Sequence, residues 1–269
     1  MNNLHRELAP ISGKAWEQIE QEAARTLKRY LAARRVVDVL GPQGPEYAAV
    51  GTGHLEVIQP PDAGIEAWLR EVKPLVQLRV PFELSRRAMD SVERGANDPD
   101  LQPLKDAARK IAFAEDRAIF EGYETGHIRG IRNGCSHAAI ALPKDVAAYP
   151  AAVAQAVNQL RDAGVNGPYT LLLGEGPYTA VSAATQAGYP IARDMRNLVD
   201  GEIIWAPAID GGAVLSTRGG DFALHLGQDI AIGYLSHTET SIHLYLQETF
   251  TFLQLTAEAA VMLSSSKGK

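Results

Sequence analysis

The chain lacks several features that define whole classes of protein. Its 269 residues include a single cysteine, Cys135, which excludes an intrachain disulfide framework. Acidic side chains (32) outnumber basic ones (26), and the net charge of −6 argues against a nucleic-acid-binding surface, which needs a basic face. No apolar run approaches the roughly 18 residues of a membrane span, and the first residues, MNNLHRELAPISG, lack the apolar core of a secretory signal. We therefore expect a cytoplasmic protein with no membrane and no nucleic acid among its partners.

The composition is that of a globular protein. Apolar residues make up 46% of the chain and charged residues 22%, which excludes intrinsic disorder. A chain of this length forms one large domain or two small ones. Composition alone identifies no function.

Two helices are predicted from apolar residues that recur at helical spacing. The first follows Ser12, a good N-cap residue, and its stripe consists of Trp16, Ile19, Ala23, Leu27, Tyr30 and Leu31. The second begins near Asp98-Pro99-Asp100, and its stripe consists of Leu104, Ala108, Ile111, Ala114, Ala118 and Ile119, continuing to Phe120. Glu115 and Asp116 are neighbours in this helix, so they point apart and are expected on its solvated face.

Residues 46–84 have a looser, β-like pattern. Short apolar runs are separated by Gly53, Pro60-Pro61 and Pro74. A ribbon broken in this way seldom packs a core by itself. We therefore expect an arm or hairpin that projects against another surface.

From Pro150 onward, the pattern alternates between helix and strand. Helices are predicted at 151–163 and 177–186, and strands at 169–173, 203–209, 213–217, 222–226, 230–235 and 242–255. The last strand exceeds the usual length of about 3–10 residues, which suits a hairpin or sheet that spans the molecule.

One motif in this region resembles a nucleotide-binding turn. Gly174-x-Gly176 follows a strand and precedes a helix, as in a dinucleotide-binding fold. Thr179 stands in place of the third glycine, however, and Pro177 removes an N–H group from the helix end that would hold phosphate. A tight strand–helix turn is the favoured interpretation.

The histidines and the cysteine form no convincing catalytic or metal set. Cys135, His137 and His127 are close in sequence, but a single sulfur ligand fits no closed zinc pattern, so no metal or cofactor is predicted. No Gly-x-Ser-x-Gly elbow of a serine hydrolase occurs. A nucleophilic Cys135 with a distant histidine stays open.

A series of ordered motifs along nearly the whole chain resembles one family, the family 1 encapsulin shell proteins, also known as linocin-type bacteriocins. Among these motifs are Trp16, Val37-Asp38-Val39, Gly41-Pro42, Tyr47-Ala48-Ala49, Glu93-Arg94-Gly95, Glu115-Asp116, Gly167-Pro168-Tyr169-Thr170-Leu171, Arg218-Gly219-Gly220-Asp221-Phe222, Gly227-Gln228-Asp229, Ile232-Gly233-Tyr234 and Glu248-Thr249-Phe250-Thr251-Phe252.

The resemblance implies an α+β fold, that of the tailed-bacteriophage major capsid proteins. The peripheral domain, with its N-terminal helix and long spine helix, would comprise residues 1–45, 85–134 and 218–269. The extended arm, or E-loop, would be residues 46–84, and the axial domain residues 135–217.

The family's function is structural rather than enzymatic. About sixty copies, or a larger icosahedral number, close into a bacterial nanocompartment in the cytoplasm. This shell encloses a cargo enzyme, commonly a dye-decolourising peroxidase or a ferritin-like protein, which is recruited by a short C-terminal targeting peptide.

The resemblance also assigns binding residues. The cargo peptide would lie in an apolar groove between the N-terminal helix and the sheet, lined by Leu27, Tyr30, Leu31, Arg34, Asp38, Asp229, Ile230, Ile232 and Tyr234. For Arg34 and Asp38 the alternative is a plain intrachain ion pair.

Two further sites of the family concern small molecules. The five-fold pore would fall at Gly188, Tyr189, Pro190 and Ile191, for which an ordinary surface turn is the alternative. Some members stack a flavin on a tryptophan between arm and spine. Arg87 occupies that position here, so no flavin is predicted.

Three other functions stay open at this point. The chain could be an α/β nucleotide-dependent enzyme built around Gly174-x-Gly176, a protease or bacteriocin, or the capsid protein of a phage. The first two lack a visible catalytic set, and the third would share the fold.

Overall fold

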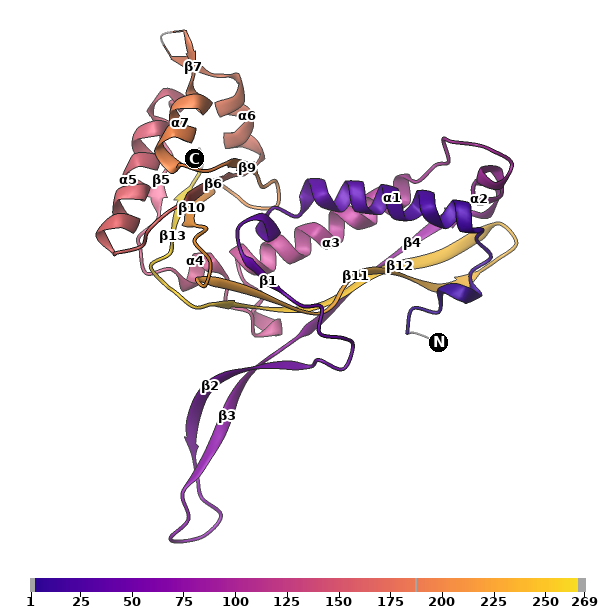
Figure 1. Ribbon diagram of the computed structural model, residues 1–269, viewed down its shortest axis with the longest axis horizontal. Coiled ribbons are helices and arrows are strands. Elements are labelled where there is room, and N and C mark those ends of the chain that lie inside the picture. The colour runs from indigo at the N-terminus through magenta and orange to yellow at the C-terminus, as the bar shows by residue number, and fades with distance from the viewer. Residues whose placement is uncertain (1–2, 187, 266–269) are drawn as a thin grey trace.

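The computed structural model describes residues 3–186 and 188–265, which form two packed blocks and one projecting hairpin (Figure 1). The first block is a four-stranded sheet, in the order β1-β11-β12-β4, covered on one face by two long helices. Its elements are η1 (Arg6–Leu8), α1 (Gly13–Tyr30), η2 (Ala33–Arg35), β1 (Asp38–Leu40), β4 (Val76–Ser85), α2 (Arg86–Glu93), α3 (Gln102–Phe120), β11 (Phe222–His237) and β12 (Ser241–Gln254).

The second block is a five-stranded sheet, in the order β5-β13-β10-β6-β9, flanked by helices. Its elements, with the short segments that lead into it, are η3 (Glu124–Gly126), α4 (Ile131–Gly134), β5 (Ile140–Ala141), η4 (Val146–Ala148), α5 (Tyr149–Asp162), β6 (Tyr169–Leu173), α6 (Glu175–Ala183), β7 (Thr185–Gln186), β8 (Tyr189–Pro190), α7 (Ile191–Val199), β9 (Ile203–Trp205), β10 (Gly212–Ser216) and β13 (Ala260–Ser264).

Helix α1 forms as its pattern predicts. The Ser12 side chain accepts a hydrogen bond from the Ala15 N–H and so satisfies one of the free donors at the helix start. Ile19 and Ala23 from the apolar stripe are buried against α3. No helix among the described residues is long and apolar enough to span a bilayer.

Strand β12 takes part in both hydrophobic cores. Its first half sends Ile242, Leu244 and Leu246 under α1 and α3. Its second half sends Phe250 and Phe252 into the core that continues into the second block, where Phe252 stacks on Phe222 of β11. A strand of 14 residues is long enough to reach both, which fixes the two blocks relative to each other.

Two of the predicted domain boundaries need correction. Residues 76–84, assigned to the arm, pair antiparallel with β12 over the whole of β4 and belong to the first block. Residues 260–264, assigned to the peripheral domain, form β13, which pairs with β10 and β5 of the second block. Both segments are short apolar runs, and only long-range pairing decides which sheet they join. Helix α7 and strand β13 were not predicted.

The remaining part of the predicted arm is a hairpin of β2 (Ala49–Ile58) and β3 (Ala67–Pro74). It projects away from both blocks (Figure 1), and its two strands form a sheet of their own among the residues that the structure describes. The expectation of a projecting ribbon is met over this shorter range.

The Gly174-x-Gly176 turn has a packing explanation. The Gly174 N–H donates to the Gly211 carbonyl oxygen at 2.8 Å, and a Cβ at Gly174 would lie 2.4 Å from the Ile209 carbonyl oxygen. The glycine is therefore required because the 209–211 backbone passes so close to it, which agrees with the favoured interpretation as a tight turn.

This contact predicts opposite effects for the two glycines. We expect Gly174→Ala to lower the stability of the subunit by about 1–3 kcal/mol, because the new methyl group overlaps a backbone that cannot move aside freely. Gly176→Ala, with no atom within 4 Å of its Cβ, is the matched control and should stabilise α6 by about 0.5–1 kcal/mol. Thermal unfolding of both variants measures this, and equal melting temperatures would contradict the packing argument.

Candidate functional site

Arg34 lies where α1, α3 and the sheet meet. Its Nε donates to Glu115 Oε1 and Oε2 at 2.9 and 3.0 Å, and its Nη2 donates to Glu115 Oε2 at 2.5 Å. The same guanidinium reaches Asp229 Oδ1 of β11 at 2.7 Å and Glu248 Oε2 of β12 at 3.3 Å. One side chain thus connects the segment after α1 to the long helix and to both central strands.

The expectation of a solvated Glu115 and Asp116 is wrong. Both side chains are completely buried. Asp116 accepts the backbone N–H groups of Ala32 and Ala33, each at 3.0 Å, and so caps the turn that carries Arg34. A signal was present, because Glu115 lies four residues from both Ile111 and Ile119 and therefore on the buried stripe.

The cluster holds more buried negative charge than one arginine can balance. Burial raises the pKa of Asp116 to about 8, although the Ala33 N–H opposes this and the charge of Glu115 adds to it. Burial also raises the pKa of Glu248, and the nearby charge and hydrogen bond of Glu115 raise it further. Burial alone would lower the pKa of Arg34, but Glu115 and Asp229 raise it above its ordinary value. The surplus of buried carboxylates thus favours the charged form of Arg34 and the protonated form of Glu248.

The nine residues predicted to line the cargo groove do not all lie together. Leu27, Ile230 and Tyr234 are half-buried beside the core under α1, and Ile232 is buried within it. Leu31 is half-buried and ends α1. Arg34 and Asp229 form an ion pair at the end of this set of residues where Ile230 lies.

Tyr30 points away from this stretch. Its ring packs against Phe113 of α3 and Trp205 of β9, with 5.6 Å between ring centres in each case. It therefore lies on the side of α1 that faces the second block.

Asp38 is also separate. Asp38 lies in β1, opposite Ala223 of β11. Ala223 comes nine residues before Ile232, so the two lie about 30 Å apart along the strand. Its carboxylate accepts the Gly220 N–H at 2.6 Å, so the alternative of an Arg34–Asp38 ion pair is not what the structure shows.

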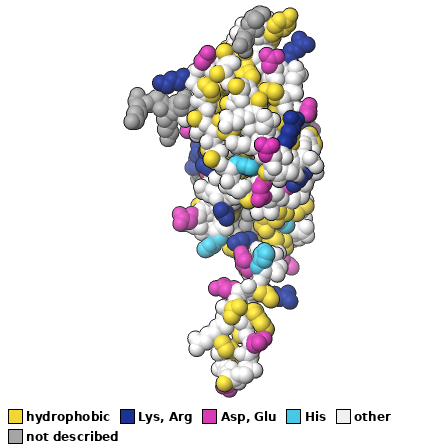
Figure 2. Space-filling view, turned by 90° about the vertical axis from the view of Figure 1, so that its left-hand side faces the viewer, with side chains coloured by type: hydrophobic (Ala, Val, Ile, Leu, Met, Phe, Trp, Pro, Cys, Tyr) yellow, Lys and Arg dark blue, Asp and Glu magenta, His cyan; other side chains and the backbone are white. Residues whose placement is uncertain are grey.

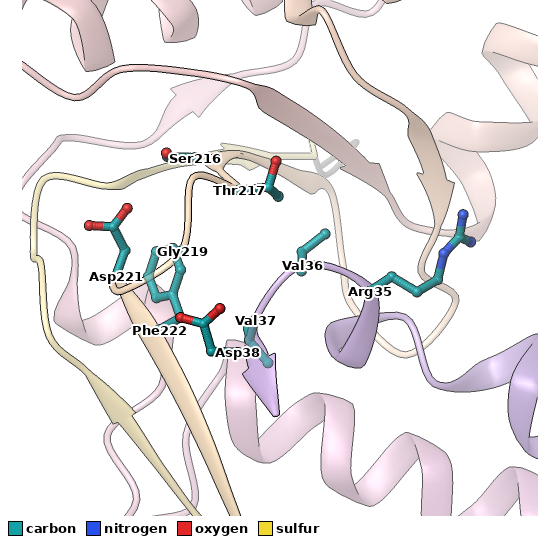
Figure 3. Close-up of a pocket in the computed structure, with 9 residues that line it drawn as sticks. All are labelled: Arg35, Val36, Val37, Asp38, Ser216, Thr217, Gly219, Asp221 and Phe222. Carbon is teal, nitrogen blue, oxygen red and sulfur yellow. The ribbon is translucent and has the colours of Figure 1, made fainter. Parts of the chain in front are cut away.

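Asp38 borders a small polar hollow of about 110 Å³ at the junction of the blocks (Figure 3). Asp221 lies across the hollow and pairs with Arg218 at 2.9 Å. The Ser216 and Thr217 hydroxyls donate to the backbone oxygens of Asn166 and Pro168. Each of these polar groups already has a partner in the protein, so the hollow is a structural joint between β10 and β11.

The predicted pore residues comprise Gly188, the short strand β8 that follows it, and the first residue of α7. Gly188 has a φ of +84°, which favours glycine, and Tyr189 is 61% exposed. Ile191, in contrast, is 1% exposed and packs into the core of the second block. Only residues 188–190 of the predicted four are therefore free to line an opening.

The cysteine and histidines come together in no site. Burial raises the pKa of the Cys135 thiol, and its Sγ lies 3.7 and 3.8 Å from the carbonyl oxygens of Arg132 and His137. His137 Nε2 lies 3.0 Å from the Glu258 carbonyl oxygen. Among the described residues, no group of three or more His, Cys, Asp and Glu side chains is placed to hold a metal ion.

The raised pKa of Glu248 predicts that the stability of the subunit depends on pH. The folded-state pKa of Glu248 lies above its ordinary value of 4.5, so its contribution to stability is complete below that pH and is lost as the pH rises through the raised pKa. We expect Glu248→Gln, whose amide reproduces the protonated acid, to flatten this fall. Near pH 8.5 its melting temperature should exceed that of the wild type, by about 2–4 °C for each kcal/mol recovered.

The matched control is Glu202→Gln, because Glu202 is exposed and pairs with Arg35. Its melting curve should follow the wild type from pH 4 to pH 9. A Glu248→Gln variant that melts below the wild type at every pH would show that Glu248 is charged in the folded protein.

Comparison with known proteins identifies the family of this chain. The family model described as "Encapsulating protein for peroxidase" matches residues 1–251. The type 1 encapsulin shell protein of Rhodococcus erythropolis is 57% identical over 264 residues, which are 98% of this chain and the whole of that protein. The relatives are named as shell proteins, which confirms the prediction of a structural chain rather than an enzyme.

Solved structures confirm the predicted fold class. A virus-like particle from Pyrococcus furiosus matches 93% of this chain and 99% of its own, with a TM-score of 0.65 at 14% identity. The capsid of the myovirus phage XM1 matches 87% and 92%, with a TM-score of 0.54 at 10% identity. The fold is that of the phage capsid proteins, and the chain belongs to the family of type 1 encapsulin shell proteins.

Proposed function

We propose that many copies of this chain close into an icosahedral nanocompartment in the cytoplasm, which encloses a cargo enzyme recruited by a C-terminal peptide. The observation that carries the assembly is the projecting hairpin. Its exposed apolar side chains include Val57, which is 78% exposed, together with Leu55, Ile58, Ile65, Trp68, Leu69 and Val72.

This apolar surface needs a partner. Figure 2 shows hydrophobic side chains on the hairpin at the lower end of the molecule. An exposed apolar surface of this kind marks an interaction site, because its contact with water is unfavourable in an isolated subunit. Neighbouring copies of the same chain would cover it in a closed shell, and about sixty copies make the smallest icosahedral one.

The proposed cargo is a peroxidase, because the matching family is described as encapsulating one. A dye-decolourising peroxidase fits best, and a ferritin-like protein is the alternative. Cargo identification by mass spectrometry of purified particles separates the two.

The proposed docking groove is narrower than the set of nine residues. Leu27, Ile230 and Tyr234 offer half-buried apolar side chains between α1 and β11, suited to aliphatic residues of a peptide. Leu31, half-buried at the end of α1, adds a fourth. Arg34 and Asp229 close one end of this stretch with their ion pair. Asp38 and Tyr30 fall outside it.

The proposed pore is the hairpin tip at Gly188, Tyr189 and Pro190. These residues are exposed and would meet their symmetry copies around a five-fold axis. Ile191 would anchor the tip from within the core.

The arm gives a direct test of assembly. We expect Val57→Asp/Leu69→Asp to abolish closed particles, because two charges would enter an apolar contact between subunits. His54→Asp, an exposed change on the same strand, should still assemble. Size-exclusion chromatography and negative-stain microscopy give the readout, and circular dichroism checks the fold. Closed particles at wild-type yield from the double variant would overturn the proposed role of the hairpin.

The groove gives a test of cargo recruitment. Ile230→Asp or Leu31→Asp should leave assembly intact and reduce co-purified cargo several-fold, because each places a charge where aliphatic side chains would dock. Leu235→Asp, at a 47% exposed position on the same strand, is the control. Cargo is counted per particle after co-expression. An unchanged cargo number in both groove variants would rule out the groove.

A further inference from the structure

A second surface, beyond the groove, is built from arginines that lie over aromatic rings. It joins α1, α3 and β9 on the side of α1 that faces the second block. We call it the arginine–aromatic patch, and its members are Arg29, Tyr30, Arg109, Phe113, Arg117 and Trp205.

The rings form the base of the patch. Tyr30 meets Phe113 edge to face, at an angle of 75° and 5.6 Å between centres, and Trp205 in a tilted contact at the same distance. All three rings are half-buried. Because they come from three different elements, the patch exists only in the folded subunit.

The guanidinium groups lie over these rings. That of Arg29 is 5.3 Å from the centre of Trp205, and that of Arg109 is 4.9 Å from the centre of Phe113. Arg117 lies 5.6 Å from Phe113 and donates through Nε to the Ala208 carbonyl oxygen. Cation–π contact holds a guanidinium in place without using its hydrogen-bond donors.

These arginines carry unbalanced charge. In the described part of the chain, no carboxylate lies within 4.0 Å of Arg29, Arg109 or Arg117, although the whole chain has a net charge of −6. Other arginines nearby are paired, Arg35 with Glu202 and Arg25 with Glu22. The patch is therefore an exposed positive site on an otherwise acidic protein.

The geometry points to an acidic peptide as its ligand, and we propose that the patch binds carboxylate side chains of a cargo protein. Arg29 and Arg109 lie 5.9 and 5.6 Å from the centre of the Tyr30 ring, so they are at most 11.5 Å apart. Carboxylates on alternate residues of an extended peptide lie about 7 Å apart, within this limit. A guanidinium fork also matches a carboxylate in two parallel hydrogen bonds.

A nucleic acid fits the patch less well. Single-stranded nucleic acid binds by stacking its bases on open aromatic faces, and here arginines lie over the rings. Three arginines also balance only a few charges, whereas a long polyanion would continue over a surface of net negative charge.

The proposal rests on the proposed function, because it supplies a second contact for the same cargo. Tyr30 belongs to the patch and Leu31, the next residue, ends the helix that borders the groove. Acidic residues that flank the segment in the groove would reach the patch around the C-terminal end of α1, where Tyr30 and Leu31 lie.

The test uses whole particles co-expressed with a fluorescent reporter protein. One reporter ends in alternating aspartate and leucine, and the other in alternating asparagine and leucine. We expect particles to retain about tenfold more of the aspartate reporter, the combined effect of several charge-assisted pairs. This comparison needs no variant of the shell, and equal retention of the two reporters would overturn the proposal.

A shell variant locates the effect. Arg29→Gln/Arg109→Gln/Arg117→Gln should reduce the aspartate reporter to the level of the asparagine one. The control, Arg25→Gln/Lys105→Gln/Lys110→Gln, removes the same charge from α1 and α3 outside the patch and should retain it. If the patch variant retains as much aspartate reporter as the control, the proposal is wrong.

Two further readouts separate the other outcomes. A fall in the 260/280 nm absorbance ratio of the patch variant, with equal retention of both reporters, would identify a nucleic-acid site and overturn the proposal. Absence of closed particles by size-exclusion chromatography of the wild type would instead refute the proposed function itself.

Discussion

The structure depends on the contacts of one side chain, Arg34. Its guanidinium holds Glu115 of the long helix, Asp229 of β11 and Glu248 of β12 at the point where the chain leaves α1. Asp116 holds the same segment of chain in place by accepting the backbone N–H groups of Ala32 and Ala33. Removing one partner of a buried ion pair leaves an uncompensated charge, and here the excess of buried carboxylates raises the pKa of Glu248. This cluster sets the position of α1 on the sheet, and with it the proposed groove and the arginine–aromatic patch on either side of that helix.

The subunit combines a rigid body, made of the two packed blocks, with an exposed arm, the β2–β3 hairpin. Strands β11 and β12 run through both cores, and the polar joint around Asp38 and Asp221 ties their near ends to β10. The body is thus one piece, while β2 and β3 form a separate two-stranded sheet within the described part of the chain. Both properties suit the proposed assembly, in which a fixed body would set the angle between neighbours and the apolar arm would supply a contact.

Local patterns predicted the local structure well. The stripe and Ser12 cap of α1 and the alternation of β12 depend on residues close in sequence, and both elements formed where expected. Apart from helix α7, which was not predicted, the failures involve partners far away in the chain. Residues 76–84 joined the main sheet through β12, and 260–264 joined the second sheet through β10. Glu115 and Asp116 looked solvated because the groups that bury them come from residues 32–34 and from β11 and β12.

The sequence by itself determined the family, the chain's acidic character and its main helices and strands, because motifs and periodicity are properties of neighbouring residues. It could not show that the nine residues predicted to line the groove lie in three different places in the fold. Ile230 and Tyr234 face the core under α1, Tyr30 faces Trp205, and Asp38 lies at the Gly220 turn. Only the tertiary structure decided this, because which side of α1 a residue occupies depends on how Arg34 and the buried carboxylates orient that helix against the sheet.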